Sequence, residues 1–352
     1  MFKKTAALAS AVGLTAFAGY SFFQRLEPYQ TERFELTAGP AAAEGYPMEI
    51  EQGRFRTSDG RSIPFGPEFL EGDWGLSHSV VVSGDGTAPA PDSLEMRWFS
   101  YTEDKFFEGR WPIPQRRIYD LLKQSFWVAS RHQYEKYSDL TACLLPTGVV
   151  VVWLTGPNQV LIGRYQAQAV NFDFKRFNEA ANRPLMIKQE QAKLPPSVQA
   201  QIRGGQLSSR QWDEYLLTYS WQVELSQPLT FYDGGVAYFS TERDFYSTSP
   251  TSPTQMPPLL AATPKPVPSY LQLVGTLPDG RRRELVVHDF DEAQTLAAFR
   301  LLHAAHPSAP ITLRLETDAD ITQGRLLLKN AYQEMPLTCS KLEIYTPTSD
   351  DN

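Results

Sequence analysis

The chain has 352 residues, of which 42% are hydrophobic and 21% charged, a composition typical of folded globular proteins and long enough for two domains. Its formal net charge of -7 provides no overall positive field for a polyanion, so nucleic-acid binding is disfavoured. Two cysteines are too few for a disulfide-stapled scaffold or a four-cysteine zinc site.

Residues 1–23 carry the pattern of an export signal. Lys3 and Lys4 precede an uncharged stretch over residues 5–23, and Ala16-Phe17-Ala18 places small residues where a signal peptidase needs them. As a helix, residues 5–23 would also rise about 28 Å, close to the roughly 30 Å of a bilayer's hydrocarbon core. The segment is therefore predicted to be a cleaved signal peptide or an uncleaved inner-membrane anchor. Both alternatives place the body in the periplasm or on the periplasmic face of the inner membrane.

Residues 29–249 are predicted to form a β-rich main domain. Apolar residues alternate with charged ones over residues 94–98, as in a half-buried strand, and the apolar run 149–154 is typical of a central strand. From Gln115 the apolar spacing becomes helical, so an amphipathic helix is expected just after Pro114. Residues 171–218 are polar and helical in character. We expect mixed, mainly antiparallel sheets with inserted helices.

Seven prolines fall between Pro250 and Pro268, a density that opposes both helix and strand ladder, so residues 250–268 are predicted to be a linker. After this linker, residues 269–347 are predicted to begin with two strands, followed by a helix through His303 and a strand over 311–316. A second helix from Asp320 and a last strand over 341–345 complete the predicted order, ββαβαβ. This order predicts a small α+β domain, and the fold class of the whole chain is α+β.

The sequence leaves two states open for the cysteines Cys143 and Cys339: a disulfide or two free thiols. An oxidising compartment would allow a disulfide between them, which would tie the C-terminal region to the main domain. They could equally be two buried free thiols, because free cysteine is among the most buried residue types. Spacing along the chain does not decide between the two, since a disulfide requires neighbouring Cα atoms.

An acidic and aromatic group near residue 105 is the main candidate for a functional surface. Paired carboxylates beside aromatic rings are typical of sites that cleave glycans, and Glu103 and Glu108 have such neighbours. The alternative is a solvated turn whose aromatic residues close the edge of the core. The predicted interaction surface consists of Tyr101, Glu103, Phe106, Phe107, Glu108 and Trp111.

Other patterns for catalysis or ligand binding are missing from the sequence. It contains neither the Gly-x-Ser-x-Gly elbow nor the phosphate-binding Gly-x-x-x-x-Gly-Lys loop. His303 and His306 have the spacing of two metal ligands on one helical face, but Pro307 follows at once and no Glu stands between them. The sequence predicts no catalytic residue, no cofactor and no metal.

Three aromatic-rich segments resemble a family of exported bacterial proteins known as domain of unknown function 2931, many of them regarded as lipoproteins. These segments are Asp92 to Trp111, Leu145 to Leu154, and Gln211 to Tyr215 before Trp221. The resemblance extends over about residues 29–245. The family has no assigned activity, so the resemblance implies no catalytic residue. Tyr20 stands where the lipid-accepting cysteine would be, so we do not expect lipidation.

These observations favour a non-enzymatic envelope protein that binds another protein. An immunity protein against a secreted toxin is one specific form of this hypothesis. The alternative is an envelope glycan hydrolase that uses Glu103 and Glu108.

Overall fold

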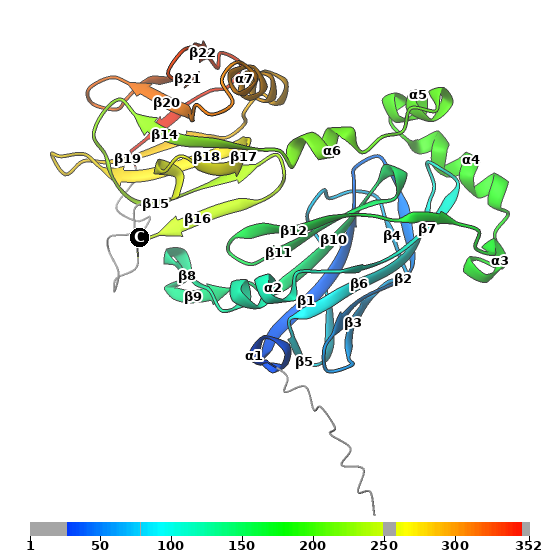
Figure 1. Ribbon diagram of the computed structural model, residues 1–352. Helices are drawn as coiled ribbons and strands as arrows, with labels where there is room; N and C mark the ends of the chain where they lie inside the picture. Colours follow the sequence, from blue (N-terminus) through cyan, green and yellow to red (C-terminus); the bar gives the residue numbers. More distant parts are fainter. Residues whose placement is uncertain (1–26, 78, 249–257, 347–352) are drawn as a thin grey trace, which may run out of the picture.

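The computed structural model describes residues 27–77, 79–248 and 258–346. The predicted signal or anchor segment, residues 1–23, lies outside these ranges, as do residues 250–257 of the proline-rich segment. Within the described ranges, no helix combines the length and the apolar character needed to cross a bilayer. Figure 1 shows an N-terminal lobe, residues 27–209, and a C-terminal lobe, residues 218–346, with α6 (Arg210–Tyr215) between them.

The N-terminal lobe is built mainly from two β-sheets that pack around a hydrophobic core. Part of a ten-stranded sheet runs in the order β12 (Gln159–Gln166), β11 (Val149–Thr155), β10 (Asp139–Leu145), β1 (Arg33–Ala42), β5 (Val81–Pro89). The second sheet runs β13 (Gln168–Val170), β7 (Lys105–Pro112), β6 (Pro91–Ser100), β2 (Met48–Thr57), β3 (Ser62–Phe65), with β4 (Glu68–Leu70) also on β2. Trp98 of β6 and Trp153 of β11 are fully buried in the same core, so the inner faces of the sheets pack together.

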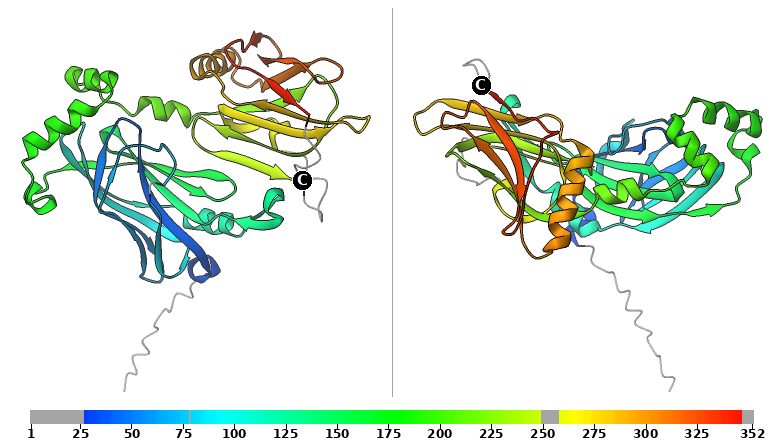
Figure 2. Two further views of the ribbon diagram at one scale, coloured as in Figure 1. Left: turned by 180° about the vertical axis from the view of Figure 1, so that it is seen from behind. Right: turned by 90° about the horizontal axis from the view of Figure 1, so that it is seen from above.

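Helices and a small hairpin are inserted between these strands. The helices are α1 (Pro28–Thr31), α2 (Gln115–Leu122), α3 (Phe174–Phe177), α4 (Arg183–Lys193) and α5 (Pro196–Gly204), and the hairpin is β8 (Ser125–Val128) and β9 (Gln133–Lys136) around the 3₁₀ turn η1 (Ala129–Arg131). The predicted amphipathic helix after Pro114 is confirmed, because α2 buries Ile118 and Leu122. Figure 2 shows α3, α4 and α5 at the end of the N-terminal lobe away from the C-terminal lobe.

The C-terminal lobe completes the ten-stranded sheet and adds another. Its strands of the first sheet are β16 (Arg243–Ser247), β15 (Thr230–Tyr238), β18 (Pro268–Thr276), β19 (Arg282–Val287) and β23 (Glu343–Tyr345). The five-stranded sheet runs β17 (Thr263–Pro266), β14 (Thr218–Leu225), β20 (Ile311–Thr317), β21 (Gly324–Lys329), β22 (Glu334–Pro336), and η3 (Pro258–Leu260) precedes β17. Phe299 of α7 (Glu292–Ala305) packs on Trp221 of β14, with ring centroids 5.9 Å apart, so α7 covers this sheet.

The fold class is α+β, as predicted, with mostly antiparallel pairing. The strand pairs β1–β10 and β14–β20 are parallel. Among the described residues, the two lobes share the ten-stranded sheet through one residue pair, Gln159 of β12 opposite Arg243 of β16.

The lobes do not divide at residues 250–268, so the predicted boundaries of 29–249 and 269–347 need correction. β15 precedes this segment and pairs with β18 after it, from Thr230 opposite Thr276 to Tyr238 opposite Pro268. β14 pairs with β17, which lies inside the segment predicted to be a linker. Prolines are tolerated in β17 because it is the edge strand of its sheet. The C-terminal lobe therefore begins at β14, about fifty residues before the predicted boundary.

The ββαβαβ order predicted for residues 269–347 is correct only in its first part. β18, β19, α7 and β20 follow the predicted order. The helix predicted from Asp320 is absent, and a turn leads there into β21 instead. The Asp318 carboxylate accepts a hydrogen bond of 2.6 Å from the amide of Thr322, which closes this turn and directs the chain back along β20.

Candidate functional site

The aromatic residues of the β6–β7 hairpin lie on both faces of the six-stranded sheet. On the inner face, Phe107 stacks on Trp98, with ring centroids 5.6 Å apart. On the outer face, Phe106 and Tyr101 belong to a second apolar cluster with Phe99. Residues of α3 and α4 cover this cluster, and they include Phe174, Phe177 and Ile187. Both faces are therefore enclosed at this end of the hairpin.

The predicted interaction surface consequently needs correction. Tyr101, Phe106 and Phe107 are buried, and Trp111 is half-buried with its indole Nε1 donating a 3.0 Å hydrogen bond to the carbonyl of Gln166. The Tyr101 hydroxyl donates to the carboxylate of Glu49. Burial, reinforced by Glu49, raises the pKa of Tyr101. These rings stabilise the core rather than present a docking face.

Glu103 lies in the turn before β7 and is directed toward the ten-stranded sheet. Its carboxylate accepts hydrogen bonds from the Ser100 hydroxyl, at 3.0 Å, and from the amide of Thr147, at 3.1 Å, in the turn η2 (Pro146–Gly148). Burial raises the pKa of Glu103, and these two donors oppose the shift. Thr147 has a left-handed backbone conformation, with φ of 65°, and Glu103 accepts the hydrogen bond of its amide.

Glu108 lies on β7 and points to the outer face of the six-stranded sheet. Arg97 holds it with two hydrogen bonds, Nε to Oε2 at 3.1 Å and Nη2 to Oε1 at 3.0 Å. The same arginine donates to Glu51 at 3.1 Å. Glu103 and Glu108 therefore serve different partners on different sides of the sheet.

A charged groove of about 630 Å³ runs along the same outer face, over β2, β6 and β7. Three arginines form ion pairs with the single carboxylate of Glu95: Arg54 at 2.8 Å, Arg56 at 2.6 Å and Arg110 at 3.0 Å. The close contact with Arg56 is the main cause that lowers the pKa of Glu95. We call Arg54, Arg56, Arg110 and Glu95 the arginine groove. Glu108 also lines the groove but is engaged by Arg97, so three guanidinium groups face the one carboxylate of Glu95, although the chain as a whole is acidic.

The prediction from sequence missed the arginine groove, although its signal was present. Arg54 and Arg56 flank the buried Phe55, and Glu95 lies between the buried Leu94 and Met96, so all three point outward. The pairing of β2, β6 and β7 then places Arg54, Glu95 and Arg110 opposite one another. That lateral register cannot be read from one strand alone.

The histidines considered as metal ligands have other neighbours. His303 packs edge-on against Tyr219, and His306 stacks on Tyr332 with ring centroids 3.8 Å apart. His288 lies 3.6 Å from the carboxylate of Glu343. Over residues 27–77, 79–248 and 258–346, no three His, Cys, Asp or Glu side chains form a group that could hold a metal ion.

The two cysteines are separate free thiols in the structure, so the predicted alternative of a disulfide is not realised. Cys143 is buried in β10, between β11 and β1, and Cys339 is exposed in the C-terminal lobe. Burial raises the pKa of Cys143 to about 12, which keeps this thiol protonated and unreactive. The other alternative, two buried thiols, is correct for Cys143 only.

Comparison with known proteins matches the N-terminal part of the chain to a family. A family model described as a protein of unknown function (DUF2931) matches residues 24–205. The matched range includes the strands and helices of the N-terminal lobe through α5 and ends before β14. No curated protein and no solved structure matches the chain.

Proposed function

This chain belongs to the DUF2931 family of proteins of unknown function, and on that premise we propose that it is an exported, non-enzymatic protein-binding module of the bacterial cell envelope. A toxin-neutralising immunity protein is one specific form of this proposal. The basic and then apolar pattern of residues 1–23 supports export. The arginine groove is the single observation that carries protein binding.

The arginine groove suits a partner that presents an acidic segment. Arg54 and Arg110 are partly exposed while they pair with Glu95, so each retains donors for a carboxylate of the partner. Guanidinium groups bind carboxylates through two parallel hydrogen bonds, which gives both affinity and orientation. Arginine is also enriched at interfaces, where it often contributes a large share of the binding energy.

The glycan-hydrolase alternative has less support. Glycan cleavage requires two carboxyl groups that flank one bond, one of them free to donate a proton and the other free to act as base or nucleophile. Glu108 is engaged by Arg97 through two hydrogen bonds, and Glu103 accepts from the η2 turn on the other side of the sheet. The raised pKa of Glu103 suits a proton donor, but Glu103 accepts a hydrogen bond from the Thr147 amide, which is a structural role.

The binding proposal is tested by reversing one charge in the groove. Arg110→Glu places a second carboxylate beside Glu95 and should weaken binding of the partner by at least about tenfold. Arg325→Glu is the matched control. Both arginines lie on strands, are about equally exposed at 69% and 71%, and pair with one glutamate side chain. The tagged proteins are incubated with envelope extract, and retained proteins are identified by mass spectrometry and titrated after purification.

The expected result is an envelope protein with an acidic segment that binds the wild type and Arg325→Glu but not Arg110→Glu. Equal retention by all three proteins would contradict binding through the groove. Export is tested separately with alkaline phosphatase fused to the C-terminus, which is active only outside the cytoplasm. A stable but inactive fusion would contradict export. The N-terminal residue of the purified protein distinguishes cleavage after Ala18 from anchoring.

A further inference from the structure

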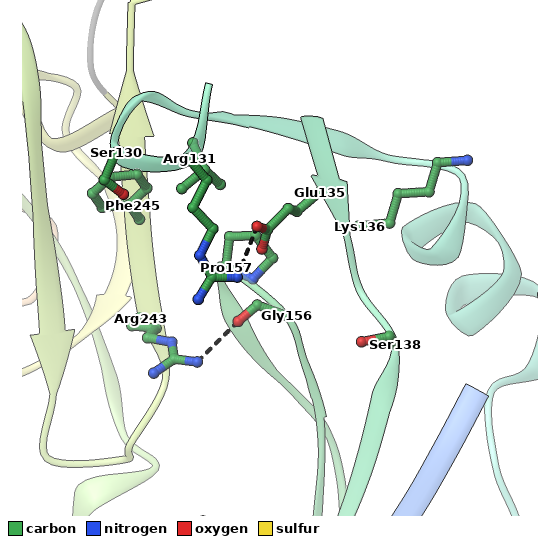
Figure 3. Close-up of a pocket in the computed structure, with 10 residues that line it drawn as sticks. Ser130, Arg131, Glu135, Lys136, Ser138, Gly156, Pro157, Arg243 and Phe245 are labelled. Atoms are coloured by element: carbon green, nitrogen blue, oxygen red, sulfur yellow. Dashed lines mark hydrogen bonds and ion pairs between the residues drawn. The ribbon is translucent and has the colours of Figure 1, made fainter. Parts of the chain in front are cut away.

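A second polar cavity lies where the two lobes meet. Its volume is about 440 Å³, within the range of small-molecule sites, which run from roughly 300 to 1,000 Å³. Figure 3 shows its three walls: the β8–β9 hairpin, the turn at Gly156 and Pro157 between β11 and β12, and β16 of the C-terminal lobe. We call it the junction pocket.

Arg243 of β16 brings a half-buried positive charge to the junction pocket. Its Nη2 donates a hydrogen bond of 2.9 Å to the carbonyl of Gly156, while its buried Nε has no hydrogen-bond partner. In the part of the chain that the structure describes, this guanidinium forms no ion pair with a carboxylate. Burial lowers the pKa of Arg243, the mark of a charge held away from water. Such a charge is costly unless an anion pairs with it.

Arg131 enters the junction pocket from the opposite lobe. It belongs to η1, and its guanidinium forms an ion pair of 2.8 Å with Glu135 of β9. In Figure 3 the guanidinium groups of Arg131 and Arg243 approach the same turn, at Gly156 and Pro157, whereas the amine of Lys136 points away. The two arginines thus face one space, with Glu135 as the carboxylate that lines it.

The remaining lining divides into a polar and an apolar part. The Ser138 hydroxyl faces the junction pocket in Figure 3 and can donate to an anionic oxygen. Phe245, Val128 and Pro157 provide apolar surface beside the arginines. Two guanidinium groups and a hydroxyl offer more donors than the two oxygens of a carboxylate accept, but they suit the three terminal oxygens of a phosphate group.

We propose that the junction pocket binds a small soluble molecule that carries a phosphoryl group together with an apolar or ring-shaped part. The phosphoryl oxygens accept from Arg131, Arg243 and Ser138, and the apolar part lies against Phe245. Because Arg131 and Arg243 belong to different lobes, the bound ligand holds the two lobes together. This site is separate from the arginine groove and does not depend on the proposed protein partner.

The test is calorimetric titration of the full exported body with phenyl phosphate as the probe. Arg131→Gln should weaken binding at least about tenfold, because it removes one of the two charges. Glu135→Gln should strengthen binding several-fold, because it frees Arg131 from its competing carboxylate. Arg116→Gln is the matched control: Arg116 is 68% exposed and pairs with Asp120 four residues on, as Arg131 is 66% exposed and pairs with Glu135.

We therefore expect weaker binding by Arg131→Gln, tighter binding by Glu135→Gln and unchanged binding by Arg116→Gln. The melting temperatures of the three variants without phenyl phosphate should equal that of the wild type. Absence of saturable binding by the wild type, or equal affinity in all four proteins, would overturn the proposal. Tighter binding of benzoate than of phenyl phosphate would overturn the assignment to a phosphoryl group. The opposite signs expected for Arg131→Gln and Glu135→Gln separate ligand binding from a merely structural role, since both variants break the same ion pair.

Discussion

The indole Nε1 of Trp74 donates a hydrogen bond of 3.0 Å to the carbonyl of Phe239, and this bond joins the N-terminal lobe to the C-terminal lobe. The Trp74 ring also packs edge-on against Trp153, with centroids 4.7 Å apart. Gln159 adds a second link, since its side-chain amide donates to the carbonyl of Gly75 and to the hydroxyl of Thr241, both at 3.0 Å. The lobes are thus held by side chains more than by the shared sheet.

Trp74→Phe should destabilise the protein by about 1–3 kcal/mol, because it leaves the Phe239 carbonyl without its donor while it keeps an aromatic ring. The urea midpoint of unfolding measures this effect. Trp127→Phe is the control, since Trp127 is half-buried in the β8–β9 hairpin and packs on Tyr134, and its indole donates no hydrogen bond within the described residues. Equal shifts of the midpoint in both variants would contradict the role assigned to Trp74.

Asp233→Asn should stabilise the protein at pH 7.5 by about 1–2 kcal/mol. Burial raises the pKa of Asp233 to about 6, so the folded state binds more protons than the unfolded state between about pH 4 and pH 6. Stability therefore falls as pH rises through this window, and the cost is fully present above it. Asparagine removes the charge and can still accept from the amide of Gly234, 2.8 Å away in the wild type.

The gain from Asp233→Asn should disappear near pH 4, where the wild-type carboxyl is protonated as well. Asp279→Asn serves as the control with the opposite sign. Hydrogen bonds from Arg281 lower the pKa of Asp279, so this variant should not stabilise the protein at neutral pH. Denaturant unfolding at several pH values compares the two variants. A gain for Asp233→Asn that is equal at pH 4 and pH 7.5 would exclude the proposed ionisation.

Glu103→Gln and Glu108→Gln should each leave function intact and change stability by less than about 1 kcal/mol. The amide that replaces the Glu103 carboxylate still offers an oxygen to the Thr147 amide, and Arg97 retains Glu51 when Glu108 is neutralised. Trp98→Ala should instead cost about 3–5 kcal/mol, because Trp98 is fully buried against Phe107. Loss of the biological phenotype in either glutamine variant, with an unchanged melting temperature, would show that the carboxylate acts directly.

Cleavage within residues 250–256, at an inserted site for a specific protease, should leave the two fragments associated. β15 lies before this segment, where it pairs with β16, and it also pairs with β18, which lies after the segment. Strand pairing therefore joins the two fragments. The fragments should co-elute in gel filtration under native conditions and separate only in denaturant. Separation without denaturant would restore the predicted boundary between two independent domains.

Local patterns predicted the elements well where burial alone decides them. The apolar run 149–154 became β11, buried throughout except at Thr155, and the helical spacing after Pro114 became α2. Trp98 belongs to the run 94–98, where apolar residues alternate with charged ones, and it is fully buried as that pattern predicts. These features depend on periodicity within one element, and one sequence contains that information.

Pairing between distant elements could not be predicted in the same way. β14 pairs in parallel with β20, about ninety residues later, so no local signal assigns β14 to the C-terminal lobe. The run Leu326-Leu327-Leu328 fits a helix or a buried strand equally well. The turn at Asp318 brings this run back alongside β20, where it pairs as the strand β21. Of the two alternatives for the acidic and aromatic hairpin, only the exposed surface is contradicted, because α3 and α4 cover its outer face from a position some seventy residues away.

The single residue pair between β12 and β16 has a consequence for self-association. Beyond Gln159, β12 has no strand partner among the described residues on the side opposite β11, so most of one edge is unpaired. Unpaired edges are templates on which strands of other molecules add and aggregate. The backbone amide of Leu161, on this unpaired edge, donates a hydrogen bond of 3.0 Å to the carboxylate of Glu242 from the C-terminal lobe. Further along the strand, the Arg164 side chain donates to the carboxylate of Asp213 in α6. Glu242 of the C-terminal lobe and Asp213 of α6 thus place two carboxylates along an aggregation-prone edge.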